Sequence, residues 1–415
     1  MTPPRPAALF AFALAVSIQA APAPYGWPEQ AFSPLTAERI AALPPEERPA
    51  WQDYWDRSET FLRQLPVRPK PDASPLKPMS TPPLGGAHSK GLRLKESPAW
   101  YAGADAAAVA DRVVEAQTAA GGWTKGTDYS RPIPPSATEK TQPMFDNDAT
   151  VSELRFLAQV LTASPRHAHA RTWHEAFGRG MSYVFAAQYP NGGFPQIYPL
   201  VGGYHDGVTF NDDAMANVLA LLRDVAAGAR PFAFTAAPLR QEAARRFDRG
   251  IDCILSAQLR RDGERTVWCQ QHDPLTLRPA AARNFEPIAD CARESATLVL
   301  LLMELPQPSA DAIAAVRGAV AWFRRTALSD LRIARAPADL RGHAVPSPGA
   351  PLLWARFYQP GTATPVFGDR DRTVHYDLSE ISPERVAGYA WYTDLPNKAL
   401  ATFDRWNRKV AASVN

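Results

Sequence analysis

One motif recurs three times along the chain at almost constant spacing, and it restricts the fold more than any other feature. Each copy is a helical stretch that ends in glutamine and runs into a glycine-bearing turn, with the glutamines at Gln117, Gln188 and Gln258. The separations are 71 and 70 residues. Regular repeats are typical of chains whose units bury their apolar faces against neighbouring copies.

A second helix is expected in each repeat. Phe145–Ala149 and Phe210–Ala214 are acidic and amide-rich, and an apolar pattern with helical spacing follows each of them. Arg293–Ala296 takes this place in the third repeat. The sequence therefore predicts a mainly α protein, an incomplete α/α toroid of three helical hairpins with long irregular loops. A two-layer helical solenoid is the alternative.

The N-terminal part differs from the repeats. Residues 1–20 combine Arg5 with an apolar run and small residues at the end, which predicts a signal peptide. The apolar run, Ala7–Ile18, is too short to span a bilayer, and a buried helix is its alternative. Residues 21–96 are predicted as an extension with a Pro-rich connector, and 97–415 as the catalytic domain. We expect an exported protein without a membrane span, either periplasmic or secreted.

Composition excludes several classes of protein. Lys and Arg (45) nearly balance Asp and Glu (42), so no strong positive field favours nucleic acid. Glycine-rich nucleotide-binding motifs and the Gly-x-Ser-x-Gly motif of serine hydrolases are absent. Cys253, Cys269 and Cys291 have no zinc-binding spacing, so we interpret them chiefly as small buried residues.

The second-helix starts are the strongest candidates for chemistry. Asp146 and Asp212 are expected at equivalent places in neighbouring repeats, with the side-chain oxygens of Asn147 and Asn211 beside them. Carboxylate and amide oxygens suit a hard cation such as calcium. Helix capping is the alternative for all these acids, and it fits Asp148 and Asp213 better.

Other polar and aromatic residues are ambiguous alone. Arg283 and Arg370 lie in expected loops, where a surface ion pair is the ordinary role of an arginine. His272 is more typical of a structural hydrogen bond than of a metal ligand. Three aromatic residues could stack on sugars or could equally pack in the core: Trp123, Phe194 and Trp268.

Taken together, the motifs resemble the pectate lyases of polysaccharide lyase family 10. The resemblance covers roughly residues 97–395, with departures at Thr124, Gly126 and Val386. Its motifs are Gly121–Lys125, Phe145–Thr150, Gln188–Gln196, Thr209–Met215, Trp268–Asp273, Ala282–Glu286, Trp354–Tyr358 and Arg385–Tyr389.

The resemblance implies calcium-dependent β-elimination of polygalacturonate. By similarity, Asp146 and Asp212 would hold calcium and Arg283 would be the base. Arg370 would pair with a substrate carboxylate, and Lys125, Asn147 and Trp123 would contribute to substrate binding. Because a guanidinium is almost always protonated, an Arg base predicts an alkaline pH optimum.

Two other functions stay open. A metal-independent polysaccharide hydrolase on the same toroid would use a carboxylate pair and yield saturated products. A non-catalytic binder of acidic glycan would keep the groove without turnover. The expected partner is in every case an acidic polysaccharide, and we expect a monomer.

Overall fold

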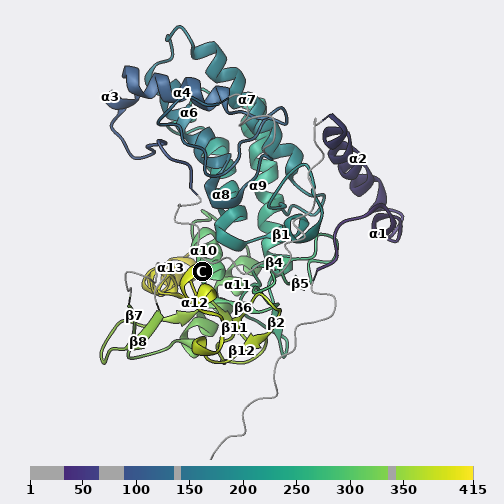
Figure 1. Ribbon diagram of the computed structural model, residues 1–415, viewed down its shortest axis with the longest axis vertical. Coiled ribbons are helices and arrows are strands. Elements are labelled where there is room, and N and C mark those ends of the chain that lie inside the picture. The colour runs from purple at the N-terminus through teal and green to yellow at the C-terminus, as the bar shows by residue number, and fades with distance from the viewer. Residues whose placement is uncertain (1–31, 65–87, 135–141, 335–342, 415) are drawn as a thin grey trace, which may run out of the picture.

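The computed structural model describes residues 32–64, 88–134, 142–334 and 343–414. Within these ranges the chain forms four successive helix–loop–helix units (Figure 1). The predicted signal peptide and most of the Pro-rich connector fall outside the described residues. The helices of the four units are α4 (Ala104–Glu115) with α6 (Val151–Ala163), α7 (Ala170–Ala187) with α8 (Ala214–Ala227), α9 (Ala237–Ala257) with α10 (Ala292–Met303), and α11 (Ala310–Thr326) with α13 (Pro396–Val414).

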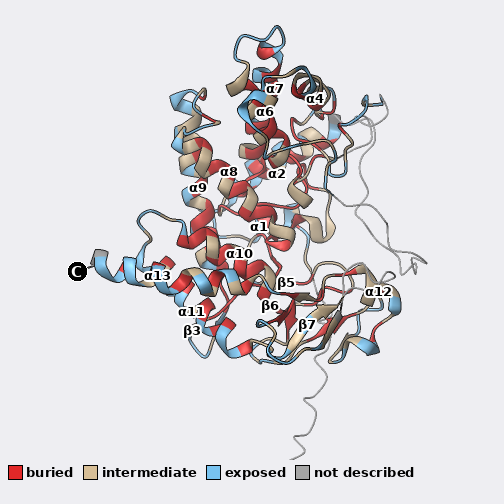
Figure 2. Ribbon diagram, turned by 90° about the vertical axis from the view of Figure 1, so that its left-hand side faces the viewer, coloured by how far each residue is buried: buried red, intermediate tan, exposed pale blue. Residues whose placement is uncertain are grey.

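The units stack into two helical layers. The second helices α6, α8, α10 and α13 contact one another in succession, and the first helices flank them, with contacts between α4 and α7 and between α9 and α11. Buried residues run along α8 and α10, whereas the free side of α13 is exposed (Figure 2). A helix that is apolar on most sides belongs in an interior, and α8 and α10 have such sequences.

This arrangement confirms the predicted incomplete α/α toroid. The ring is open, because the unit of α4 and α6 lies at the opposite end of the molecule from that of α11 and α13 (Figure 1). The number of hairpins differs from the prediction: a fourth unit follows the three marked by glutamine. It escaped the repeat pattern because Ala327, rather than glutamine, follows its first helix.

The repeated glutamine links each unit to the next by hydrogen bonds. In the first three units its Nε2 donates to a carbonyl of its own loop and to a carbonyl in the first helix of the following unit. For Gln188 these acceptors are Gly192 O at 2.9 Å and Arg246 O at 2.8 Å. The 70-residue spacing therefore reflects one contact made three times.

The glycine turns allow this contact. Gly192 has a φ of +91°, and a Cβ there would lie 2.0 Å from the carbonyl oxygen of Arg249 in α9. Only glycine permits both the left-handed backbone and this close approach. Gly121 repeats the arrangement against Arg179 in α7.

Short antiparallel strands organise the long loops at one end of the hairpins. β1, β4 and β5 form one sheet in the order β1-β4-β5, and the other strands pair as β2 with β3, β6 with β10, β7 with β8, β9 with β13, and β11 with β12. Their bounds are β1 Val208–Thr209, β2 Arg260–Arg261, β3 Glu264–Arg265, β4 Gln271–His272, β5 Pro279–Ala280, β6 Asp290–Cys291, β7 Leu331–Ala334, β8 His343–Pro346, β9 Trp354–Ala355, β10 Phe357–Tyr358, β11 Phe367–Gly368, β12 Val374–His375 and β13 Tyr392–Thr393. The pairing of β10 with β6 brings the fourth loop onto the start of α10.

The N-terminal helices pack on this scaffold. Those described before unit 1 are α1 (Ala37–Ala41), α2 (Arg48–Gln64) and α3 (Pro98–Tyr101). Tyr54 of α2 donates a hydrogen bond to Ala187 O, and Ser58 accepts one from Leu200 N. Arg39 of α1 pairs with Asp273 at 2.7 Å. Part of the predicted extension thus joins the main core.

Two further findings concern single predictions. In the part of the chain that the structure describes, no helix is both long enough and apolar enough to cross a membrane. Cys253, Cys269 and Cys291 are buried free thiols, which confirms their interpretation as small core residues.

Candidate active site

Two strained turns lie side by side at the starts of inner helices. They are the 3-10 turns η1 (Asp146–Asp148) before α6 and η3 (Asn211–Asp213) before α8, and they contact each other. Asn147 and Asp212 have left-handed backbones, with φ of 51° and 48°, and so do Asp148 and Asp213. Left-handed residues other than glycine cost about 1–2 kcal/mol each and cluster at functional sites.

The backbone corrects the expected equivalence of Asp146 and Asp212. The matching φ and ψ values show that Asn147 in η1 is structurally equivalent to Asp212 in η3, so Asp146 corresponds to Asn211. The two carboxylates therefore differ in setting. The Asp146 side chain is 6% exposed, whereas that of Asp212 is 28% exposed.

The capping prediction for the neighbouring acids is wrong. Asp213 occupies the N-cap position of α8, but its side chain makes no capping hydrogen bond; it pairs with Arg293 at 3.1 Å. Asp148 accepts a hydrogen bond from Asn217 and lies 3.4 Å from His88. Burial raises the pKa of Asp148, and the charge of His88 only partly opposes this effect.

Asp146 retains an oxygen that could bind a metal. Its Oδ2 pairs with Lys125 Nζ, while its buried Oδ1 has no hydrogen-bond partner among the described residues. A buried carboxylate oxygen without a donor fits a hard cation, because calcium takes oxygen ligands. The described residues contain no preformed cluster of three or more His, Cys, Asp or Glu side chains for a metal, so further ligands would come from amides, water or substrate.

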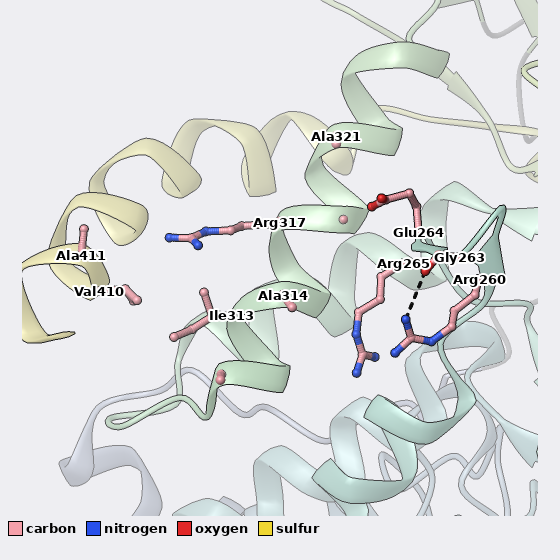
Figure 3. Close-up of a pocket in the computed structure, with 12 residues that line it drawn as sticks. Arg260, Gly263, Glu264, Arg265, Ile313, Ala314, Arg317, Ala321, Val410 and Ala411 are labelled. Atoms are coloured by element: carbon pink, nitrogen blue, oxygen red, sulfur yellow. Dashed lines mark hydrogen bonds between the residues drawn. The ribbon is translucent and has the colours of Figure 1, made fainter.

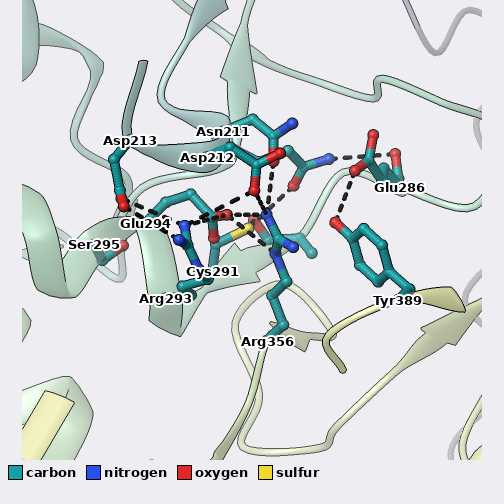
Figure 4. Close-up of polar contacts among 12 residues, drawn as sticks. Asn211, Asp212, Asp213, Glu286, Cys291, Arg293, Glu294, Ser295, Arg356 and Tyr389 are labelled. Atoms are coloured by element: carbon teal, nitrogen blue, oxygen red, sulfur yellow. Dashed lines mark hydrogen bonds and ion pairs between the residues drawn. The ribbon is translucent and has the colours of Figure 1, made fainter. Parts of the chain in front are cut away.

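Asp212 is surrounded by arginines. Arg356 Nη2 lies 3.2 Å and Arg293 Nη1 4.0 Å from its Oδ1 (Figure 4). Burial alone would raise the pKa of Asp212, but Arg356, Arg283 and Arg293 outweigh burial and lower the pKa to about 2. The carboxylate is thus ionised at every pH of interest.

The charge of Arg283 acts on Asp212, but its guanidinium is paired with the carboxylate of Glu286. Its Nε and Nη2 donate to Glu286 at 2.8 and 2.5 Å, and Tyr389 Oη donates to the same carboxylate at 2.7 Å. Although burial favours the neutral form of Arg283, the charge of Glu286 prevails and raises its pKa further. The Arg283 side chain is 37% exposed, so it remains accessible.

Arg370 belongs to the same group of arginines. It donates to Glu384 from Nε at 2.8 Å and Nη2 at 3.0 Å, and its guanidinium stands 5.5 Å from the ring centre of Phe285. Arg283 lies 5.0 Å from that ring centre. The structure therefore brings Arg283 and Arg370 to one ring near Asp212, with Asp146 in the adjoining turn η1 and Lys125 paired to it from the loop after α4.

The aromatic residues serve the core. Trp123 and Trp268 are fully buried and Phe194 is 1% exposed, so none offers a face to a sugar. The expected role of Trp123 in substrate binding is corrected accordingly. Its Nε1 donates to Val113 O at 2.7 Å, and Trp268 and Trp354 make the same bond to the first helix of their own units.

Reasoning from residue types alone missed the buried partners of the site. Glu294 at the start of α10 pairs with Arg356, which also donates to Asn211 Oδ1 at 2.7 Å. Arg356 and Tyr389 come from the fourth loop, with the guanidinium 4.6 Å from the ring centre. Their motifs were visible, but only the pairing of β10 with β6 shows that this loop folds back over η3.

Of two hollows in the described structure, one is lined by a residue of the candidate site and the other is not. A cleft of about 850 Å³ lies between the β2–β3 hairpin, α11 and α13, and no residue of the group above lines it (Figure 3). A smaller pocket of about 460 Å³ is lined by Lys125 together with Thr124, Thr127 and Arg131. Lys125, which pairs with Asp146, therefore links the candidate site to this smaller pocket.

The chain is similar to a known protein family and to solved structures of polysaccharide lyases. The family model described as pectic acid lyase matches residues 117–400. A family 10 polysaccharide lyase from Cellvibrio cellulosa, solved as a mutant in complex with trigalaturonic acid, is similar with a TM-score of 0.67 and 32% identity, covering 76% of this chain and 94% of that chain. A second structure of a family 10 polysaccharide lyase from Cellvibrio cellulosa has a TM-score of 0.67 and 33% identity, covering 72% and 92%. No curated protein sequence matches the chain.

Proposed function

Because this chain belongs to the pectic acid lyase family and is a polysaccharide lyase, we propose that it cleaves de-esterified polygalacturonate by calcium-dependent β-elimination. The observation that carries the proposal is the meeting of η1 and η3. Asp146, whose buried Oδ1 has no partner among the described residues, and Asp212 lie on these contacting turns, and the charge of Arg283 acts on Asp212. Such a site combines acidic metal ligands with cations for an acidic substrate.

The reaction removes the C5 proton of a galacturonate residue and expels the oxygen at C4. That proton is weakly acidic, because its removal places a second negative charge beside the carboxylate. When bound, calcium would supply positive charge at that carboxylate. Asp146 and Asp212 would hold the ion, with Asn147 beside Asp146 in the same turn.

Arg283 takes the C5 proton in this proposal. Its free nitrogen is Nη1, because Nε and Nη2 are engaged by Glu286. The guanidinium must first lose a proton, and Glu286 opposes that loss by raising the pKa of Arg283. The positive charges of Arg370 and of a bound cation would lower the pKa of Arg283. Alkaline pH would further favour the neutral form of its guanidine.

The cations around the base would orient the polymer. A guanidinium offers a planar fork that matches a carboxylate, which suits Arg370 to a neighbouring galacturonate. Lys125 is 41% exposed beside Asp146 and would meet a further carboxylate. Because the polymer is extracellular, we also propose that the chain acts in the periplasm or after secretion.

The nature of the product tests this function. Purified protein is incubated with polygalacturonate at alkaline pH, and ultraviolet absorbance and new reducing ends are recorded together. β-Elimination predicts both signals in parallel, with loss of both after a chelator is added. Reducing ends without absorbance would identify a hydrolase, and neither signal would identify a non-catalytic binder.

A further inference from the structure

Every arginine of the candidate site is paired with a protein carboxylate. Five guanidinium groups, those of Arg283, Arg293, Arg356, Arg370 and Arg385, meet five carboxylates, those of Asp212, Asp213, Glu286, Glu294 and Glu384. The group is therefore electrically neutral before any ligand binds. A site for a polyanion would instead be expected to hold an excess of positive charge.

Glu384 accepts hydrogen bonds from two different arginines, whereas each of the other four acids accepts them from one arginine among the described residues. It accepts two hydrogen bonds from Arg370, at 2.8 and 3.0 Å, and also pairs with Arg385, from Nε at 2.6 Å. Burial would raise its pKa, but these two arginines lower it to about 2. The negative charge on Glu384 is thus permanent.

Glu384 also differs in position from Glu286 and Glu294. The side chains of Glu286 and Glu294 are fully buried beneath the group, whereas that of Glu384 is 15% exposed and that of Arg370 is 26% exposed. Glu384 belongs to α12 (Pro383–Gly388), and Arg385 beside it is 5% exposed with its guanidinium 4.3 Å from the ring centre of Phe285. A ligand carboxylate that approaches Arg370 therefore meets Glu384 at the same surface.

We propose that Glu384 is a specificity-determining residue, which lowers the preference of the Arg370 subsite for free galacturonate over its methyl ester. This inference rests on the proposed function, in which Arg370 faces a substrate carboxylate. Glu384 already occupies the Nε–Nη2 edge of Arg370, and its negative charge opposes the charge of Arg370. A charged carboxylate therefore gains less there over a neutral ester, because repulsion by Glu384 partly offsets attraction by Arg370. The sequence left methyl-ester tolerance open, and this contact addresses it.

The test compares substrates rather than absolute rates. We measure kcat/KM for polygalacturonate and for highly methyl-esterified pectin, and take their ratio, for the natural protein and for Glu384→Gln. Removing the charge should raise the ratio about fivefold, the value of a partly exposed ion pair. Added salt should shrink the difference, because the effect is electrostatic.

A matched control separates this effect from a general loss of an ion pair. Glu175→Gln also removes a carboxylate from an arginine, Arg171, but on the remote surface of α7. Its ratio should equal that of the natural protein. A folded Glu384→Gln variant with an unchanged ratio, or a control that shifts equally, would overturn the proposal.

A second variant keeps the proposal testable if Glu384→Gln does not fold. Glu384→Asp retains the charge that the buried Arg385 needs, but is one methylene too short to hold both arginines. Its ratio should rise in the same direction by a smaller factor, and an unchanged ratio would count against the role. If the natural protein forms no unsaturated product, the proposed function fails instead. The Glu384 inference is then judged by calorimetric binding of trigalacturonate and its methyl ester to both proteins.

Discussion

The environment of Arg283 in the structure opposes the role of base that we propose for it. A base must give up its own proton first, yet Glu286 raises the pKa of this guanidinium. The same contact has a positional benefit, because two hydrogen bonds fix the plane of Arg283 and leave Nη1 as the free edge. Glu286 therefore orients the base at the expense of its basicity.

This opposition predicts a shift in pH dependence. In Glu286→Gln the carboxylate charge is lost, the pKa of Arg283 falls, and more neutral guanidine is present at a given pH. The rising limb of the kcat/KM profile should move to lower pH by about one unit or more. Steady-state rates across pH check this, with the remote Glu175→Gln as control. An unmoved limb would argue against Arg283 as the base.

The two turn carboxylates predict a loss of calcium-dependent activity. Asp146→Asn and Asp212→Asn each remove a proposed ligand charge with little change in shape, so kcat should fall about 100-fold or more. Asp404→Asn, which removes an exposed acid paired with Arg324, should leave kcat unchanged. Circular dichroism verifies folding. Full activity in either turn variant would contradict its assignment to the metal.

At the scale of helices and loops, the repeated glutamine is the clearest link between sequence and fold. Its spacing predicted three units, and the structure explains that spacing by a contact between units. The fourth unit could not be found in this way, because Ala327 takes the place of the glutamine. Trp354 does repeat the bond of Trp123 and Trp268, but its motif resembles theirs too little to be aligned from one sequence.

The glutamine contact predicts a large effect on stability. Gln188→Ala leaves the carbonyls of Gly192 and Arg246 without their donor in a buried place, so the free energy of unfolding should fall by about 2–4 kcal/mol. Gln52→Ala removes an exposed glutamine of α2 and should change it by less than about 0.5 kcal/mol. Urea denaturation measures both. Equal effects would show that the contact does not hold the units together.

The site was predictable in its turns but not in its pairings. The acidic and amide residues of η1 and η3 are adjacent in sequence, so a local pattern reveals them. Their register was missed by matching one acid with another, although Phe145–Ala149 aligned with Phe210–Ala214 already sets Asp146 against Asn211, as the left-handed backbones at Asn147 and Asp212 show. The ion pair between Arg356 and Glu294 joins residues 62 positions apart and depends on the path of the fourth loop.

Across the whole molecule, two buried acids make stability depend on pH. Burial raises the pKa of Glu153 and of Asp206 to about 7, from 4.5 and 3.8. Between these values the folded chain binds more protons than the unfolded chain. Their contribution to stability is therefore complete at low pH and is lost as pH rises toward about 7. If Arg283 is the base, as proposed, activity rises with pH while this contribution to stability falls.

Glu153→Gln tests this linkage. Glu153 accepts hydrogen bonds from Tyr129 at 3.0 Å and Ser89 at 3.1 Å, which glutamine can also accept, while no buried charge has to form. At each pH we compare the unfolding free energy of the variant with that of the natural protein. This difference should favour the variant by roughly 1–3 kcal/mol more at pH 8 than at pH 5. Glu304→Gln, at an exposed acid, should show no such pH dependence. A difference for Glu153→Gln that is independent of pH would contradict the raised pKa.

The most direct test of the central claim is a calcium titration of the initial rate at which polygalacturonate yields unsaturated product at alkaline pH. β-Elimination by the proposed site predicts a rate that saturates with free calcium, vanishes in chelator and returns when calcium is restored. Arg283→Ala should remain inactive at every calcium concentration. A rate that is insensitive to chelator, or an Arg283→Ala variant as active as the natural protein, would contradict it.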